Sequence, residues 1–232
     1  MLLRQWQLLF ADPVDLTGFV LFVLVFPVYH GIYPWLMRLF PNRAAKVRLD
    51  EFRRSWIEGL IVRRDIVVGA QQTRNLTMVN SLLASSALIL MGFTANLLLQ
   101  LPRVEQELPV QMWAGDADLV GLKLLLLILV FGVSFAYCMT ALRHLGHFNL
   151  VIGADPDVIA AREGSAVDYL SALINRASNR STLAVRCLYS ATPLFLWLFD
   201  NRLFIVVTVL WGIKFAAFQD FAHLLRQHER GD

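Results

Sequence analysis

The sequence is poor in charge and in cysteine. Charged residues make up only 17% of its 232 residues, whereas soluble domains carry about a quarter. Its two cysteines, Cys138 and Cys187, both lie in apolar stretches, so the sequence offers neither a disulfide framework nor a cysteine-based zinc site. Hydrophobic residues instead make up 57% of the chain, and the mean hydropathy is +0.55. This composition indicates a protein whose solvent is lipid.

Motifs that carry catalysis or hold phosphate are also lacking. The sequence has no nucleophile elbow, kinase signature, HExxH helix, Rossmann fingerprint or glycine-rich phosphate loop. We therefore predict no catalytic residue and no cofactor, and we expect that the protein is not an enzyme. A membrane-embedded enzyme is kept as a third hypothesis, behind the two functions described below.

Signals for metal and for nucleic acid are equally weak. His144 and His147 are three residues apart and share a helix face, but metal sites in helical bundles add carboxylates from other helices. No Asp or Glu lies inside a predicted span, so we predict no metal site. The net charge of +3 fits basic residues that mark the cytoplasmic side of a membrane protein, and we expect no nucleic-acid partner.

Five apolar stretches approach or reach the length of about 20 residues that a helix needs to cross a bilayer. They are residues 16–35, 81–101, 119–142, 183–199 and 203–218. The sequence therefore predicts an all-α fold, an integral membrane helical bundle with four or five transmembrane helices. The whole chain, 1–232, is expected to form a single membrane domain. Its connections 37–80 and 143–182 are predicted to be helical and cytoplasmic.

The choice between four and five spans depends on the polar residues Asp200, Asn201 and Arg202. A single span over the last two stretches would place all three in mid-bilayer, which is costly. If the two stretches form separate spans, these three residues become the tight turn of a hairpin, and Asp200 or Asn201 caps the next helix. The sequence favours the hairpin, although each arm is short.

Charge distribution predicts the orientation. The connection after the first span holds nine Lys or Arg against four acidic residues, and the positive-inside rule places such a segment in the cytoplasm. The N-terminus is then outside and, with five spans, the basic C-terminus is cytoplasmic. No secretory signal is recognised. We predict a multi-pass protein of a bacterial inner membrane, in which Lys123 reaches the headgroups from the end of the third span.

The two cytoplasmic connections carry helix signals of their own. In the first, apolar residues recur at helical spacing from Leu49 to Leu60, which predicts an interfacial helix that bends before Arg63. In the second, Asp155-Pro156-Asp157 predicts a turn and a helix start, followed by one polar helix towards Ser171.

A polar stripe marks the second span and the residues before it. Its members share an arc of about 80° on an ideal helix, and they are Gln71, Arg74, Ser81, Ser85, Gly92 and Asn96. We expect this stripe to face other helices or a wet cavity rather than lipid. One interpretation is close helix packing through Ser and Gly. The other is a path for permeation or for a ligand.

Several further residues are candidates for function. Tyr29 and His30 follow Pro27 in the first span, where a proline-broken helix can form a binding site or an interface anchor. The basic residues predicted to contact anionic lipid or a partner are Arg53, Arg54, Arg63 and Arg64.

The chain resembles the domain-of-unknown-function family 599. The resemblance rests on Tyr29-His30, Arg54-Ser55-Trp56, Gln72-Thr73-Arg74-Asn75, Ala84-Ser85-Ser86-Ala87, Asn149-Leu150-Val151-Ile152 and Pro193-Leu194-Phe195-Leu196-Trp197-Leu198-Phe199, and it covers about residues 15–220. It implies a multi-span membrane protein and draws attention to His30, Trp56, Arg74 and Asn75. It implies no activity and no catalytic residue.

Two functions from different classes follow from these features. The sequence favours a small oligomeric ion channel or transporter, because five short spans enclose little by themselves and a pore would form between the subunits of a homo-oligomer. The alternative is a membrane assembly or adaptor protein that binds a partner or anionic lipid through its basic cytoplasmic loop. The partners expected under both are the lipid bilayer, anionic lipid and further copies of the chain.

Overall fold

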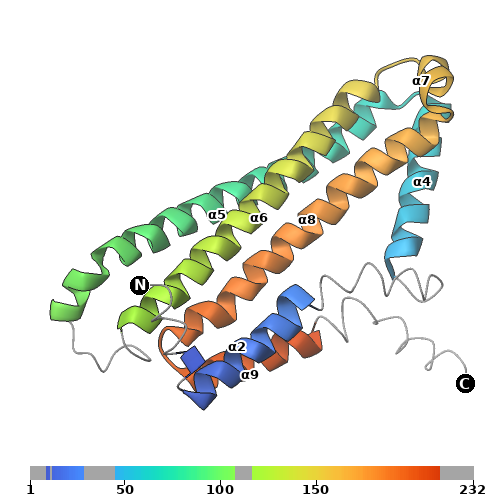
Figure 1. The fold of residues 1–232 in the computed structure, drawn as a ribbon. Coiled ribbons are helices and arrows are strands. Elements are labelled where there is room, and N and C mark those ends of the chain that lie inside the picture. Colours follow the sequence, from blue (N-terminus) through green and yellow to red (C-terminus); the bar gives the residue numbers. More distant parts are fainter. Residues whose placement is uncertain (1–8, 11, 29–44, 108–116, 215–232) are drawn as a thin grey trace, which may run out of the picture. The chain divides into compact units, whose positions relative to one another are not determined.

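The structure, a computed structural model, describes residues 9–10, 12–28, 45–107 and 117–214. Helices account for nearly all of these residues, and no strand occurs among them. The principal elements in chain order are α2 (Pro13–Val23), the π-helical turn η1 (Leu24–Val28), α4 (Ala45–Arg63), α5 (Ile66–Glu107), α6 (Ala117–Val151), α7 (Pro156–Glu163), α8 (Ala166–Trp197) and α9 (Asn201–Lys214) (Figure 1). The prediction of an all-α fold is confirmed.

Among the described residues, two helices are long and apolar enough to cross a membrane. They are the stretch Ile66–Leu101 of α5 and the stretch Asp118–Val151 of α6. A helix rises about 1.5 Å per residue, so both exceed the hydrocarbon core of a bilayer, which is about 30 Å thick. By length and composition, these two helices of the described chain could each cross a bilayer.

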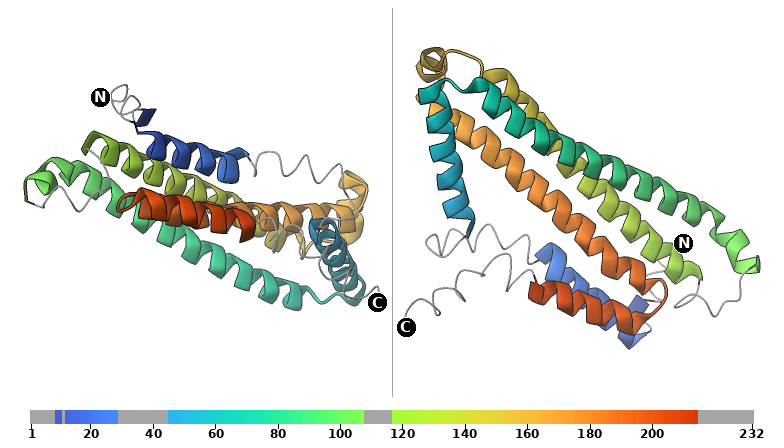
Figure 2. Two further views of the ribbon diagram at one scale, coloured as in Figure 1. Left: turned by 90° about the horizontal axis from the view of Figure 1, so that it is seen from below. Right: turned by 180° about the vertical axis from the view of Figure 1, so that it is seen from behind.

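The described residues fall into two compact units. Unit 1 takes its residues from 1–45, 88–132 and 187–232, and unit 2 takes them from 46–87 and 133–186. In unit 1, α2 and α9 lie side by side (Figures 1 and 2). They approach closely because Gly18 has no side chain: a Cβ atom there would lie 2.9 Å from the ring of Phe204.

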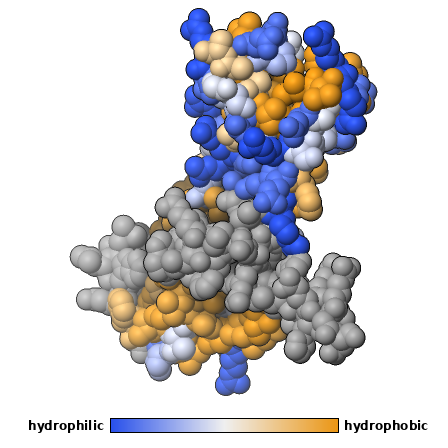
Figure 3. All heavy atoms as spheres, turned by 90° about the vertical axis from the view of Figure 1, so that its right-hand side faces the viewer, coloured by the Kyte–Doolittle hydropathy of each residue, from blue (hydrophilic) through white to orange (hydrophobic). Residues whose placement is uncertain are grey.

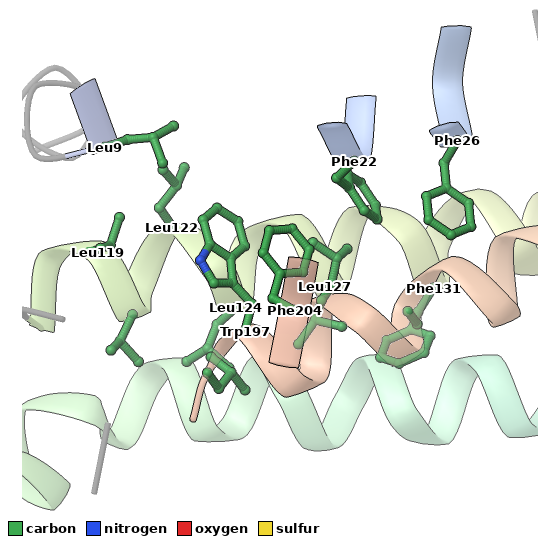
Figure 4. Close-up of a cluster of buried hydrophobic side chains, with 14 of the residues drawn as sticks. Leu9, Phe22, Phe26, Leu119, Leu122, Leu124, Leu127, Phe131, Trp197 and Phe204 are labelled. Carbon is green, nitrogen blue, oxygen red and sulfur yellow. The ribbon is translucent and has the colours of Figure 1, made fainter. Parts of the chain in front are cut away.

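The core of unit 1 is rich in aromatic rings. Trp197 stacks on Phe204 with ring centroids 4.6 Å apart and an interplanar angle of 12°. The ring centroids of Phe22 and Phe204 are 6.0 Å apart. Leucines from α6 complete the cluster, among them Leu124 and Leu127 (Figure 4). These contacts join α2, α6, α9 and the end of α8 in one apolar core, which contributes most of the stability of the unit.

Unit 2 has a separate core and a more polar surface. Leu60, Leu145, Phe148 and Leu170 form part of its core, and Trp56 stacks on Phe148 at a centroid distance of 6.2 Å. Figure 3 looks onto the part of this unit with α4 and α7, where hydrophilic residues surround a smaller apolar group. Both cores thus lie between helices, as ridge-into-groove packing requires.

The first and last predicted spans are described in part. The first is helical from Pro13 to Val28, with its N-terminus capped by Asp12, whose carboxylate accepts a hydrogen bond of 2.8 Å from the backbone N–H of Val14. The π-helical turn contains Pro27, which has no N–H to donate. Positions 29–35 and 215–218 of the predicted spans lie outside the described residues.

The predicted hairpin is confirmed as a helix break. α8 ends at Trp197 and α9 begins at Asn201. The Asp200 carboxylate accepts hydrogen bonds from the backbone N–H groups of Arg202, at 2.6 Å, and of Leu203, at 2.9 Å. It therefore caps α9, one of the two capping residues that the sequence proposed.

Two expectations for the connections are wrong. α4 includes Arg63 instead of bending before it, and the chain turns at Arg64, whose φ is 54°. α7 begins after Asp155 as predicted, but it ends at Gly164, whose φ of 83° suits glycine because it has no Cβ. The polar helix that was expected to run to Ser171 is therefore two helices. The second, α8, has Ser165 at its start, whose hydroxyl accepts from the N–H of Asp168 at 3.2 Å.

Candidate functional site

The polar stripe of α5 is exposed along its whole length. All six of its residues, four in unit 2 and two in unit 1, are exposed: Gln71, Arg74, Ser81, Ser85, Gly92 and Asn96. A Cβ atom added to Gly92 would meet nothing within 4 Å. In the described chain the stripe therefore does not pack against other helices, and the two interpretations of it, close helix packing and a path for permeation or a ligand, stay predictions.

A different face of α5 makes its contacts. Its buried residues recur at intervals of three, four or seven positions and are Gly69, Thr73, Asn80, Ala84, Ala87, Thr94 and Leu101. On an ideal helix their centre lies about 140° round from the stripe. The contact is close because these residues are small: a Cβ atom at Gly69 would lie 2.7 Å from Ile152. Within the described chain the buried seam of α5 therefore lies on a different face from the polar stripe.

Hydrogen bonds reinforce the buried seam in unit 2. The Thr73 hydroxyl donates to the Asn149 side chain, which joins α5 to α6. On the exposed face, by contrast, the Asn96 amide oxygen accepts a bond of 3.0 Å from Gln100 one turn further along the same helix. The stripe therefore presents an amide that bonds within its own helix, together with the exposed serines Ser81 and Ser85.

A buried ion pair in unit 1 is the feature that the sequence did not reveal. Lys123 is fully buried and Asp15 is 2% exposed, and the Lys123 Nζ lies 3.7 Å from Asp15 Oδ1. Lys123 was expected to extend to the headgroups, and this expectation is wrong, because its ammonium is enclosed by the core. The only sequence signal was a single charge inside an apolar run.

Trp197 and Asn201 complete the polar cluster around this pair. The Lys123 ammonium donates to the carbonyl oxygen of Trp197 at 2.9 Å and to Asn201 Oδ1 at 3.4 Å, and it lies 4.8 Å from the Trp197 ring centroid. The Trp197 indole N–H donates to Asp15 at 2.6 Å. The cluster, named here the Lys123 cluster, therefore ties the α8–α9 turn to α2 and α6 through charge-assisted hydrogen bonds.

The basic residues of α4 are mostly paired within unit 2. Arg53 donates to Asp50 at 2.8 Å, and also to Asn175 and Ser178 of α8. Arg54 pairs with Asp168 of α8 at 2.5 Å. Arg53 therefore joins α4 to α8 by hydrogen bonds instead of forming an exposed contact with lipid or a partner.

The end of α4 is more open. Arg63 lies 3.8 Å from Asp65 in an exposed pair, and such pairs contribute little to stability. Arg64 is exposed at the turn. Of the basic residues predicted to contact lipid or a partner, these two lie most freely on the surface.

The other predicted candidates are placed in part. Trp56 is half-buried against Phe148, which makes it a packing residue, and Asn75 is exposed on α5. Tyr29 and His30 lie outside the described residues. Within the described part of the chain, no group of three or more His, Cys, Asp or Glu side chains could hold a metal ion.

Comparison with known proteins gives a family and no activity. Neither the curated proteins nor the solved structures contain a match to the chain. One family model, described as "Protein of unknown function, DUF599", matches residues 17–223. This range covers nearly all of the helices described above and confirms the resemblance seen in the sequence. The chain therefore belongs to the family of proteins of unknown function DUF599.

Proposed function

We propose that the protein is a small ion channel or transporter, formed by several copies of the chain in a bacterial inner membrane, and that the stripe of α5 lines its pathway. The observation that carries the proposal is the exposure of all six stripe residues on a helix whose packing face lies elsewhere. Ser85, Gly92 and Asn96 lie within the stretch of α5 that is apolar enough to span a bilayer.

The physical argument concerns what covers this stripe. Lipid tails offer no hydrogen-bond partner, so an amide such as that of Asn96 is costly where it faces them. A second copy of the chain, or water in a pore between copies, supplies the missing partners. Homo-oligomers with closed symmetry are common, and their symmetry repeats one stripe around a central axis.

The membrane arrangement under this proposal has five spans. α5 and α6 cross the bilayer, as do the helix that begins with α2, the second part of α8, and α9. The turn at Asp200 is exposed and polar, which suits a headgroup position between two short arms. The basic segments that follow the first span and end the chain face the cytoplasm, and the N-terminus is outside.

Ion flux in liposomes tests the proposal with a matched pair of variants. Ser85 and Ser86 are neighbours that lie about 100° apart around α5, and only Ser85 belongs to the stripe. We expect wild-type full-length protein in sealed liposomes to conduct at least one common ion. Ser85→Leu and Asn96→Leu should lower the flux at least tenfold, and Ser86→Leu should leave it unchanged.

Two results would contradict the proposal. One is the absence of flux for all common monovalent ions from protein that is helical and monodisperse. The other is an equal loss in Ser85→Leu and Ser86→Leu, because added bulk alone would then explain the effect. The adaptor alternative has less support, since the carboxylates of Asp50 and Asp168 already occupy Arg53 and Arg54.

A further inference from the structure

A second group of basic side chains gathers in unit 2, on α6 and α8. Arg143, His144 and His147 lie within about one turn of one another on α6, and Arg176 and Arg180 are one turn apart on α8. Tyr137, whose ring packs against the Arg180 guanidinium, and His144 are two turns apart on α6 and so share a face of that helix. This group is named here the α6–α8 basic cluster.

The register of the two helices explains how the cluster forms. The Ser134 hydroxyl of α6 donates to the carbonyl oxygen of Ala184 on α8 at 2.9 Å. Three residues further along α6, the Tyr137 ring lies 5.6 Å from the Arg180 guanidinium. The helices are therefore antiparallel, and Arg176 comes level with the next turn of α6, which leads to His144.

The cluster is open to solvent and lacks acidic partners. Arg143, His147, Arg176 and Arg180 are exposed, and His144 is half-buried. Among the described residues, no carboxylate forms an ion pair with any of the five, whereas Arg53, Arg54 and Arg63 of α4 each have one. Like charges one turn apart on a helix repel. An anion bound between the two helices would relieve this repulsion.

The position of the cluster along the helices indicates the kind of anion. On α6 it follows directly after the predicted span 119–142, and on α8 it comes just before the predicted span 183–199. Both helices would therefore leave the hydrocarbon region at this level, on the side that the positive-inside rule assigns to the cytoplasm. Tyr137, against which Arg180 packs, is an aromatic residue of the type that is enriched at headgroup depth.

We propose that the α6–α8 basic cluster binds the phosphate group of an anionic lipid. Arg176 and Arg180 supply guanidinium groups, whose forked N–H donors match phosphate oxygens. His144 contributes a further donor from α6. This inference rests on the membrane arrangement proposed above, but it does not depend on a pore at α5.

The test measures lipid binding to the full-length protein in a non-ionic detergent. Dioctanoyl phosphatidic acid is titrated by calorimetry, with dioctanoyl phosphatidylcholine and inorganic phosphate as separate arms. We expect saturable binding of the phosphatidic acid and none of the zwitterionic lipid. Each basic residue near an anionic headgroup contributes about fivefold in affinity. The double variant Arg176→Gln/Arg180→Gln should therefore bind about 25-fold more weakly.

Matched variants separate a site from general charge. Arg63→Gln/Arg64→Gln removes the same charge from exposed positions of unit 2 and should leave the affinity within about twofold. His144→Phe should weaken binding about fivefold from the other helix, because it removes one hydrogen bond to the phosphate. Equal losses in the Arg63/Arg64 and Arg176/Arg180 variants would overturn the proposal, as would an unchanged affinity in the His144→Phe variant. Inorganic phosphate that binds as tightly as the lipid would overturn the assignment to lipid.

Discussion

The ammonium of Lys123 donates a hydrogen bond of 2.9 Å to the main-chain carbonyl oxygen of Trp197, in the last turn of α8. Carbonyls at a helix C-terminus have no partner within the helix and carry the negative end of its dipole. A cation at this place is therefore stabilised twice, by the helix end and by the Asp15 carboxylate 3.7 Å away. The contact connects the middle of the sequence to the turn before α9.

Removal of Lys123 should destabilise the protein more than removal of an ordinary lysine. In Lys123→Met the Asp15 carboxylate stays buried without its cation, and breaking a buried pair in this way costs about 3 to 5 kcal/mol. Lys214→Met is the control, because Lys214 lies 3.9 Å from the Trp211 ring centroid and so packs against an aromatic face. Chemical unfolding in detergent, followed by circular dichroism, measures both changes.

A double-mutant cycle tests that the two charges act as a pair. Asp15→Asn keeps an oxygen that can accept from the Trp197 indole but removes the negative charge. The variant Lys123→Met/Asp15→Asn should therefore be more stable than the sum of the two single losses predicts. Additive losses would show that Asp15 and Lys123 are not coupled.

The indole N–H of Trp197 is predicted to matter separately from its ring. Trp197→Phe keeps an aromatic ring against Phe204 but removes the bond to Asp15, which is 2.6 Å long. A hydrogen bond to a charged group contributes about 1.5 to 3 kcal/mol, so the free energy of unfolding should fall by about that amount. Trp56→Phe makes the same change at a half-buried site and should cost less. Equal losses at the two sites would contradict a specific role for the indole N–H.

The parts of the fold that the sequence predicted are those with local signals. The break at Asp200 is visible because three consecutive polar residues interrupt an apolar run, and the start of α7 is visible because Asp155 precedes a proline. Each signal lies within a few residues of the structure that it causes. The break at Gly164 was missed because one glycine in a polar stretch does not separate a helix end from a loop.

The packing face of α5 could not be predicted for a physical reason. In a soluble protein the apolar face of a helix is the buried one, but lipid is as apolar as a protein core, so polarity does not distinguish the two sides of a spanning helix. The buried face of α5 carries Thr73 and Asn80, and the exposed face carries Ser85 and Asn96. Likewise, nothing local to Lys123 indicates that Asp15, far away in the sequence, is its partner.

The cap at Asp200 should make the hairpin sensitive to acid. Hydrogen bonds from the backbone N–H groups of Leu203 and Arg202 hold the pKa of the Asp200 carboxyl below its ordinary value of 3.8. A group with a lowered pKa stabilises the folded state above its ordinary pKa, and this contribution is lost as the pH falls through the lowered value. Asp200→Ala should thus lower the melting temperature near neutral pH and have little effect well below pH 3.8.

Asp200→Asn separates the charge from the cap. Asparagine caps helices about as well as aspartate and does not titrate. The difference in melting temperature between Asp200→Asn and Asp200→Ala should therefore stay constant as the pH is lowered. If the melting temperatures of wild type and Asp200→Ala differ by the same amount near neutral pH and well below pH 3.8, the role of the carboxylate is contradicted.

Two glycines of α5 should respond in opposite ways to the same substitution. A Cβ atom at Gly69 would lie 2.7 Å from Ile152 and 3.0 Å from Leu60, whereas one at Gly92 would meet nothing within 4 Å. Alanine in an exposed helix interior is favoured over glycine by about 1 kcal/mol. Gly92→Ala should therefore raise the free energy of unfolding by up to about that amount, and Gly69→Ala should lower it, because the side chains of Ile152 and Leu60 have to move aside.

Gly92 also tests the proposed contact between copies of the chain. If Gly92 lies against a second copy of the chain, the larger side chain of Gly92→Leu should shift the mass of the detergent-solubilised oligomer towards the monomer, measured by light scattering. Gly146→Leu is the control, because a Cβ atom at Gly146 also meets nothing within 4 Å and it lies on α6, outside the stripe. An oligomer that is unchanged in Gly92→Leu, or one that dissociates equally in Gly146→Leu, would argue that α5 does not form the interface. The first result would also remove the reason for placing a pathway there, since the stripe would then face lipid alone.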